Sequence, residues 1–137
     1  MIKDALLLLT PDAGQKLTAA AASANQIDLG QAAPTPGMNR ILTVVFQVME
    51  DIAGKISFAV QDCDTADGTY ADVVKSMELD APEAGTQVNL LLPEKCRRYI
   101  QAYFSGTATG GTVRAFITTS SDHWYAAKEA PSKQYVI

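Results

Sequence analysis

The sequence lacks the residues from which common active sites are built. It has one histidine, His123, and two cysteines, Cys63 and Cys96, without CxxC spacing. A single histidine cannot form a His-based metal cluster or a two-histidine relay, and the separated cysteines do not match a zinc or redox motif. No serine lies in a GxSxG elbow, no GxxxxGK[ST] or GxGxxG loop occurs, and no spacing singles out a pair of carboxylates. These absences predict a protein that is not an enzyme and that binds no metal and no cofactor.

Long runs of basic or apolar residues are also absent. The net charge is −4, and Arg97-Arg98 is the one adjacent basic pair. Because duplex binding depends on clustered Lys and Arg, this composition argues against nucleic acid as a partner. The N-terminal apolar run, residues 5–9, is shorter than a signal-peptide core and far below the ~20 residues of a membrane span. We therefore expect no membrane partner and folding in the cytoplasm where the chain is made.

What the sequence has in abundance is alternation of apolar and polar residues, the pattern of half-buried strands. The clearest runs are residues 41–50, 55–61, 86–93, 97–105 and 111–119. The weaker candidates are KLTAAAAS at 16–23, NQIDLG at 25–30 and YADVVKSMELD at 70–80. The alanine run within the first of these is interpreted as a strand of small side chains, since the residues around it leave little room for a helix.

Turn-forming residues separate these runs. They are APTPGMN (33–39), EDIAG (50–54), TADG (65–68), DAPEAG (80–85) and SGTATGG (105–111), the last interpreted as a hairpin loop. About eight strands at this spacing, with no helical period, predict an all-β jelly-roll β-sandwich with extended N- and C-terminal arms. We expect one sandwich domain over residues 1–121 and a C-terminal arm over residues 122–137.

The stretch QDCDTADGTYADV, residues 61–73, resembles a calcium loop because three aspartates lie close to a glycine. Counted from Asp62, however, the EF-hand pattern has Ala66 at the fifth position, Asp67 in place of the hinge glycine, and Val73 in place of the bidentate glutamate. Asp and Gly are also the residues that β-turns prefer. The prediction is a turn between two strands, with a weak cation site as the alternative.

Three parts of the chain are candidates for contact with a partner, because they carry aromatic, arginine or apolar residues at a strand face or a chain end. The residues are Leu6, Leu7, Leu8, Leu9, Arg97, Tyr99, Tyr103, Trp124, Tyr125, Tyr135, Val136 and Ile137. Two of the three have a competing interpretation. The Arg97–Tyr103 face could be covered by the chain's own loops, and the C-terminal arm could lie on its own sheet instead of a neighbour's.

Four phrases of the sequence are similar to those of a known family: MIKDALLLL, SANQIDLG, LLLPEKCRRYIQAYF and SGTATGGTVRAFITT. In this order and spacing they resemble the cement, or capsid decoration, proteins of certain tailed bacteriophages, from residue 1 to about residue 119. The arm after Ser120 departs from the pattern, which leaves its partner open.

The resemblance implies a jelly roll that forms a homo-oligomer, dimer or trimer, on the outer surface of the phage head. There it would clamp neighbouring copies of the major capsid protein by contact alone. The alternatives are a carbohydrate-binding or host-recognition module of the virion, and a minor head-completion component. A carbohydrate-binding module usually presents a coplanar row of Trp or Tyr rings. The chain has a single tryptophan, which argues against such a module.

Overall fold

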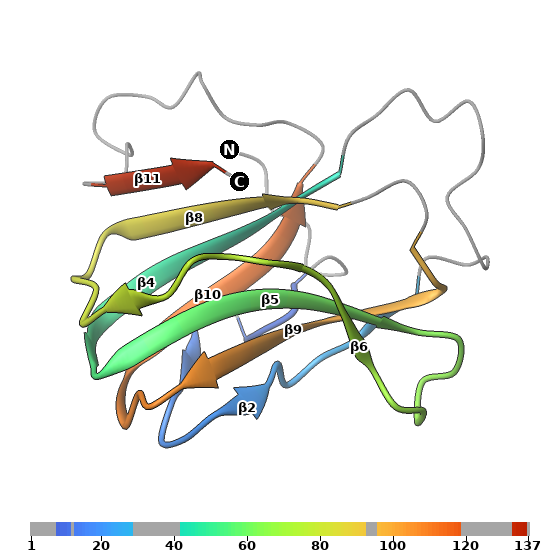
Figure 1. The fold of residues 1–137 in the computed structure, drawn as a ribbon, viewed down its shortest axis with the longest axis horizontal. Helices are drawn as coiled ribbons and strands as arrows, with labels where there is room; N and C mark the ends of the chain where they lie inside the picture. The colour runs from blue at the N-terminus through green and yellow to red at the C-terminus, as the bar shows by residue number, and fades with distance from the viewer. Residues whose placement is uncertain (1–7, 12, 29–41, 93–95, 119–132, 137) are drawn as a thin grey trace.

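The computed structural model describes residues 8–11, 13–28, 42–92, 96–118 and 133–136. Within these ranges the chain forms eleven strands and no helix. The strands lie in two layers that face each other, as Figure 1 shows. The prediction of an all-β sandwich is confirmed.

Sheet A has the spatial order β1-β10-β4-β8-β11, and sheet B has the order β2-β9-β5-β6, with β3 also paired to β9 and β7 to β5. Every pairing is antiparallel except that of β11 with β8, which is parallel. The strands of sheet A are β1 (Gln15–Lys16), β4 (Thr43–Ala53), β8 (Thr86–Leu91), β10 (Gly110–Thr118) and β11 (Lys133–Val136). Those of sheet B are β2 (Ala21–Ala22), β3 (Ile27–Asp28), β5 (Lys55–Cys63), β6 (Ala71–Lys75), β7 (Leu79–Asp80) and β9 (Tyr99–Gly106).

The order of the strands is that of a jelly roll. With β2 and β3 taken as one broken strand, and β6 and β7 as another, eight strands remain besides β11, four in each sheet. Consecutive strands alternate between the sheets, except β5 and β6, which are neighbours in sheet B. Two antiparallel sheets connected in this way form the jelly-roll sandwich.

Two of these crossings lie side by side at one end of the sandwich. The chain passes from β4 to β5 at Gly54, which has a φ of 101°, and from β9 to β10 through residues 107–109. The amide of Thr107 donates to the Lys55 carbonyl and that of Thr109 to the Ala53 carbonyl, both at 2.9 Å. The predicted hairpin at residues 105–111 is therefore wrong, because β9 and β10 belong to different sheets. Alternation of side chains predicts which face of a strand is buried, but it does not predict which strands pair with each other.

The core lies between the sheets and is formed mainly by apolar residues that alternate along the predicted strands. At its centre, Phe46 of β4 packs on Phe58 of β5 with ring centroids 5.0 Å apart. Phe104 of β9 meets both rings edge-on at 6.1 Å. The remaining core strand residues are Ile27, Val44, Val48, Ile52, Ile56, Val60, Val88, Leu90, Ile100, Ala102, Val113, Ala115 and Ile117.

Other local predictions are confirmed in part. Only Ala21 and Ala22 of the alanine run are in a strand, while residues 18–20 bend. In the predicted turn at residues 50–54, β4 continues to Ala53 and the reversal occurs at Gly54 alone. TADG forms the β5–β6 hairpin turn, and residues 81–85 separate β7 from β8. APTPGMN and the boundary between residues 121 and 122 lie outside the described residues.

Candidate functional site

The aspartate-rich stretch is the connection between β5 and β6. The Gly68 amide donates to the Thr65 carbonyl at 3.2 Å, and the Tyr70 hydroxyl donates to the Ala66 carbonyl at 3.1 Å. No group of three His, Cys, Asp or Glu side chains in the described part of the chain is placed to hold a metal ion. The prediction of a turn between two strands is confirmed.

Asp62, at the end of β5, has a structural partner that the sequence did not reveal. Its carboxylate is buried and accepts hydrogen bonds from the Arg97 amide at 2.8 Å and from Arg97 Nε at 2.9 Å. Arg97 also donates from Nη2 to the Asp62 carbonyl at 2.9 Å. Asp64, by contrast, is mostly exposed and lies 3.9 Å from the guanidinium. The hydrogen bond to Asp62 raises the pKa of Arg97. These contacts hold the chain that enters β9 against the end of β5.

The neighbouring arginine, Arg98, also binds an aspartate of its own chain. Its Nε and Nη2 donate to the Asp28 carboxylate at 2.7 and 2.9 Å, and the pKa of Arg98 is raised by this contact. The guanidinium carbon lies 5.2 Å from the centroid of the Tyr99 ring, within cation–π range. The arginine pair therefore ties β3 and β5 to β9, which reduces its value as a free anion-binding surface.

The outer face of sheet B carries a row of amide side chains between two tyrosines. Gln101 donates to Gln61 at 2.8 Å, and Gln61 donates to the Asp72 carboxylate at 2.8 Å. Tyr99 and Tyr103, which are half-buried, lie on β9 on either side of Gln101. The predicted polar and aromatic outer face is therefore present, with its central amides already hydrogen-bonded to one another.

A second row of amides crosses the outer face of sheet A, and no sequence signal indicated it. Arg114 Nε donates to Gln47 Oε1 at 3.0 Å, Gln47 Nε2 to Gln87 Oε1 at 3.2 Å, and Gln87 Nε2 to Asn89 Oδ1 at 2.9 Å. Because a guanidinium can only donate, Arg114 fixes the orientation of each amide in turn. The row ends at Asn89 Nδ2, a buried donor without a partner in the structure. The register between β4, β8 and β10 creates this row, which explains why single strands did not reveal it.

The N-terminal candidates divide between core and edge. Leu9 is fully buried in the core, and its amide donates to the Ala115 carbonyl at 2.9 Å. Leu8 forms an isolated bridge with Phe116 on β10. Leu9 therefore stabilises its own sandwich and is removed from the interface candidates. Leu6 and Leu7 lie outside the described residues.

Of the C-terminal candidates, the structure describes only those in β11. Residues 133–136, which include Tyr135 and Val136, pair with β8 of the same chain from Thr86 to Asn89. For these four residues the structure agrees with the interpretation that the arm lies on its own sheet. Trp124, Tyr125, Ile137 and His123 lie outside the described residues.

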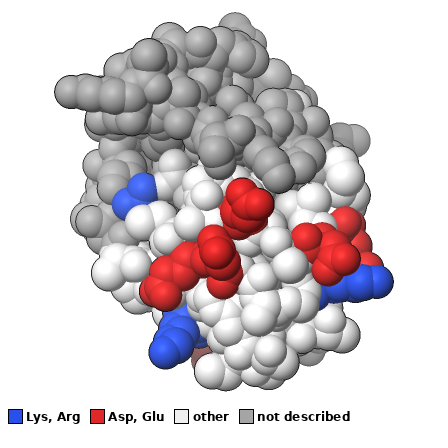
Figure 2. Space-filling view, turned by 90° about the vertical axis from the view of Figure 1, so that its left-hand side faces the viewer, with Lys and Arg blue, Asp and Glu red and all other residues white. Residues whose placement is uncertain are grey.

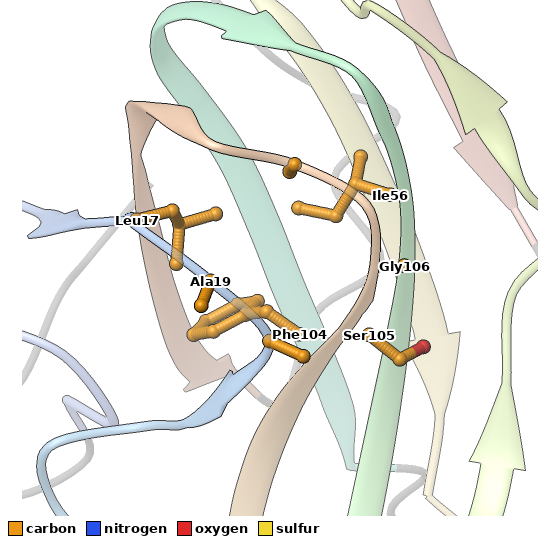
Figure 3. Close-up of a pocket in the computed structure, with 8 residues that line it drawn as sticks. Leu17, Ala19, Ile56, Phe104, Ser105 and Gly106 are labelled. Atoms are coloured by element: carbon orange, nitrogen blue, oxygen red, sulfur yellow. The ribbon is translucent and has the colours of Figure 1, made fainter.

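A shallow apolar recess opens at the edge of sheet B, with about 140 Å³ of empty space that includes open solvent. Figure 3 shows the side chains of Leu17, Phe104 and Ile56 around it, with Ala19 at its side. Its lining residues include no titratable side chain, and its one hydroxyl, that of Ser105, has no histidine or carboxylate beside it among them. The recess therefore offers packing surface and no chemistry.

The two cysteines lie away from the recess. Both are free and buried, and burial raises the pKa of the Cys96 thiol.

One end of the sandwich is mainly acidic. Figure 2 shows more red than blue among the described side chains of this face. Exposed Glu50 and Asp51 come from the end of β4, and exposed Asp80 and Glu83 from the neighbouring segment before β8. The Ala84 amide donates to Asp51 at 2.8 Å, and the Ile52 amide donates to the Pro82 carbonyl at 3.0 Å, which joins these segments.

The described residues contain no helix that is long and apolar enough to cross a membrane. Comparison with curated proteins gives no match. Comparison with family models matches residues 12–117, more than half of the chain, to the model described as Bbp16. The matched range runs from just before β1 almost to the end of β10, so it includes all eight jelly-roll strands. The chain therefore belongs to the Bbp16 family, a family of phage-associated proteins.

Proposed function

We propose that this protein is a non-enzymatic capsid decoration protein. It binds as a homo-oligomer to the outer surface of a phage head, contacts neighbouring copies of the major capsid protein and stabilises the mature shell. No cofactor, metal, nucleic acid or membrane takes part in this function.

The observation that carries the proposal is a jelly-roll sandwich in a phage-associated family. The sequence resemblance to cement proteins supports the same conclusion independently of the fold. The polar side chains that could suggest chemistry are engaged within the chain: Asp62 with Arg97, Asp28 with Arg98, and the glutamines with one another. Such a molecule presents shape, hydrogen bonds and aromatic surface to a partner.

The fold also suggests how several weak contacts hold the oligomer on the phage head. Leu8, near the N-terminus, bridges β10, while β11, near the C-terminus, pairs with β8, so both terminal segments contact sheet A. Sheet B keeps Tyr99 and Tyr103 half-exposed on its outer face. Several such contacts in one oligomer act at high effective concentration and multiply into slow dissociation. We assign Tyr99, Tyr103 and the C-terminal arm as the contact candidates.

Cosedimentation with phage heads that lack the protein tests this function. We expect saturable, stoichiometric binding to expanded heads and none to unexpanded proheads. Tyr103→Ala should weaken binding, whereas Met77→Ala, a change of an exposed side chain in the loop between β6 and β7, is the matched control. Absence of binding to either kind of head would overturn the proposal.

A carbohydrate-binding module of the virion is the second candidate function. The alternation of Tyr99, Gln101 and Tyr103 on one strand face favours it, because sugar-binding surfaces combine aromatic rings with amide hydrogen bonds. Arg98 over the Tyr99 ring weighs against it, since that ring is partly occupied. A glycan screen with the same Tyr103→Ala variant distinguishes the two functions.

A further inference from the structure

Strand β8 is buried along almost its whole length, although it would be the edge of a four-stranded jelly-roll sheet. Residues 86–90 are each exposed by 2% or less. An uncovered edge of this kind presents a row of unpaired backbone groups to any extended chain. In the structure the edge is covered by β11, which adds a fifth strand to sheet A, as seen beside β8 in Figure 1.

The pairing of β11 with β8 requires no turn. It is parallel and extends over four residue pairs, from Lys133 opposite Thr86 to Val136 opposite Asn89. A parallel strand reaches its position through a long connection, unlike the partner in a hairpin. The same four pairs can therefore form whichever copy of the chain supplies residues 133–136.

The connection before β11 is much longer than its path requires. β10 ends at Thr118, which lies at the same end of sheet A as Leu91, the last residue of β8. β11 begins at Lys133, opposite Thr86, the first residue of β8. The connection must therefore cover the length of β8. Five residues along β8 and three strand spacings across sheet A amount to about 22 Å. The chain from residue 118 to residue 133 can extend to about 50 Å. This excess allows residues 133–136 to reach an acceptor strand on an adjacent subunit.

Three unpartnered polar atoms lie at or beside the strand that receives β11. In the described part of the chain, the buried side-chain atoms without a hydrogen-bond partner are Thr43 Oγ1, Thr86 Oγ1 and Asn89 Nδ2. Thr86 and Asn89 lie opposite the two ends of β11, and Thr43 lies opposite Leu91. Each buried polar group left unpaired costs about 1–3 kcal/mol. Thr86 and Asn89 belong to β8 and Thr43 to the neighbouring β4, so this side of sheet A holds polar groups that further contacts in an assembly can satisfy.

We propose that β8 is a strand-acceptor site and that, in the assembled protein, it takes residues 133–136 of a second copy of the chain. The C-terminal strand is thereby exchanged between subunits. Exchange interlocks neighbouring copies through backbone hydrogen bonds and keeps every β8 edge covered. The inference rests on the proposed function only in requiring a homo-oligomer, and it makes no use of capsid binding.

Two variants, each with one added cysteine and a different affinity tag, test the exchange. Thr86→Cys and Lys133→Cys occupy a pair that the register places opposite each other. The variants are coexpressed, purified through both tags and oxidised, and the crosslinked peptides are identified by mass spectrometry. We expect a disulfide that joins residue 86 of one tagged copy to residue 133 of the other. Absence of this link between copies would overturn the proposal.

Controls separate exchange from general oxidation and from failure to fold. The wild-type chain measures any contribution of the buried Cys63 and Cys96. Leu91→Cys lies at the other end of β8, outside the register with β11, and should give no link to Lys133→Cys. The double variant Thr86→Cys/Lys133→Cys should give covalent oligomers, whereas an exclusively intramolecular link contradicts exchange. If Thr86→Cys does not fold, Asn89→Cys with Val136→Cys makes the same test. Cosedimentation of the reduced variants with expanded heads tests capsid binding separately.

Discussion

At the scale of single residues, the two neighbouring aspartates of the β5–β6 connection have opposite roles. Asp62 is 7% exposed and accepts hydrogen bonds from both the backbone and the side chain of Arg97. Asp64 is exposed and approaches the same guanidinium only to 3.9 Å. A calcium loop would require both carboxylates to face one ion, whereas here Asp62 faces a cation of the protein itself.

This contrast predicts different effects of two matched substitutions. Asp62→Ala leaves the part-buried Arg97 amide and guanidinium without their acceptor and should lower the free energy of unfolding by about 2–3 kcal/mol. Asp64→Ala should change it by no more than about 0.5 kcal/mol, since exposed ion pairs contribute little. Urea denaturation of both variants measures the difference. Equal midpoints for the two would show that Asp62 does not hold the start of β9.

At the scale of elements, the start of β10 shows how one glycine sets an irregular ladder. The register between β4 and β10 shifts between Gly110 and Thr112 and again before Val113. Gly111 lies within this irregularity with a φ of 102°, a backbone conformation that side chains with a Cβ rarely adopt. An added Cβ would lie 2.5 Å from Ile52 Cδ1 and 2.7 Å from the Asp51 carbonyl oxygen.

The adjacent glycines therefore form a matched pair for mutation. Gly111→Ala should destabilise the fold by about 2–4 kcal/mol, because it combines an unfavourable φ with overlap against β4. At Gly110, an added Cβ meets Ala53 Cβ at an ordinary 3.7 Å, so Gly110→Ala should stay within about 1 kcal/mol of the wild type. Thermal or urea unfolding compares the two. A Gly111→Ala variant as stable as Gly110→Ala would show that β4 and β10 can readily rearrange here.

At the scale of the whole molecule, the last strand of sheet A comes from the far end of the chain. The family match ends at residue 117, so β11 lies beyond the matched range. The eight strands of the jelly roll have all their other pairings among themselves. β11 adds cover to an edge that is otherwise open, which predicts a local rather than a global effect of its loss.

Deletion of residues 133–137 should therefore expose the edge of β8 while the sandwich stays folded. In hydrogen–deuterium exchange, peptides from residues 86–91 should exchange faster than in the full chain. Peptides that report on the β4–β10 ladder should keep their protection and serve as the internal control. Unchanged exchange in β8 would mean that β11 does not cover this edge in solution, whichever copy supplies it.

Alternation of side chains was sufficient to identify most strands and their inward faces. Val44 and Phe46 alternate along the predicted strand at residues 41–50, as Ile56 and Phe58 do along that at residues 55–61, and each is fully buried. The pattern is local, so it can be read along a single segment. The turn at residues 65–68 was predictable for the same reason, because the turn preferences of Asp and Gly act within a few residues.

The candidate surfaces were predictable to a smaller extent. Tyr99 and Tyr103 do lie on the outer face of β9, as alternation indicated. Leu9 was wrongly considered for a partner, because an apolar residue near a chain end has the same sequence signature whether it binds another protein or its own core. The row from Arg114 to Asn89 was not found at all, since its members come from three strands that only pairing brings together.

By itself, the sequence determined that the chain forms an all-β sandwich with particular residues facing inward. The tertiary structure decided which strands are neighbours, that the chain changes sheets at Gly54 and at residues 107–109, and that residues 133–136 close the β8 edge. It also decided that Asp62 binds Arg97, 35 positions away in the chain. The physical reason is that alternation is fixed by the backbone geometry of each strand, whereas pairing depends on backbone groups and side chains that meet only after distant segments have packed together.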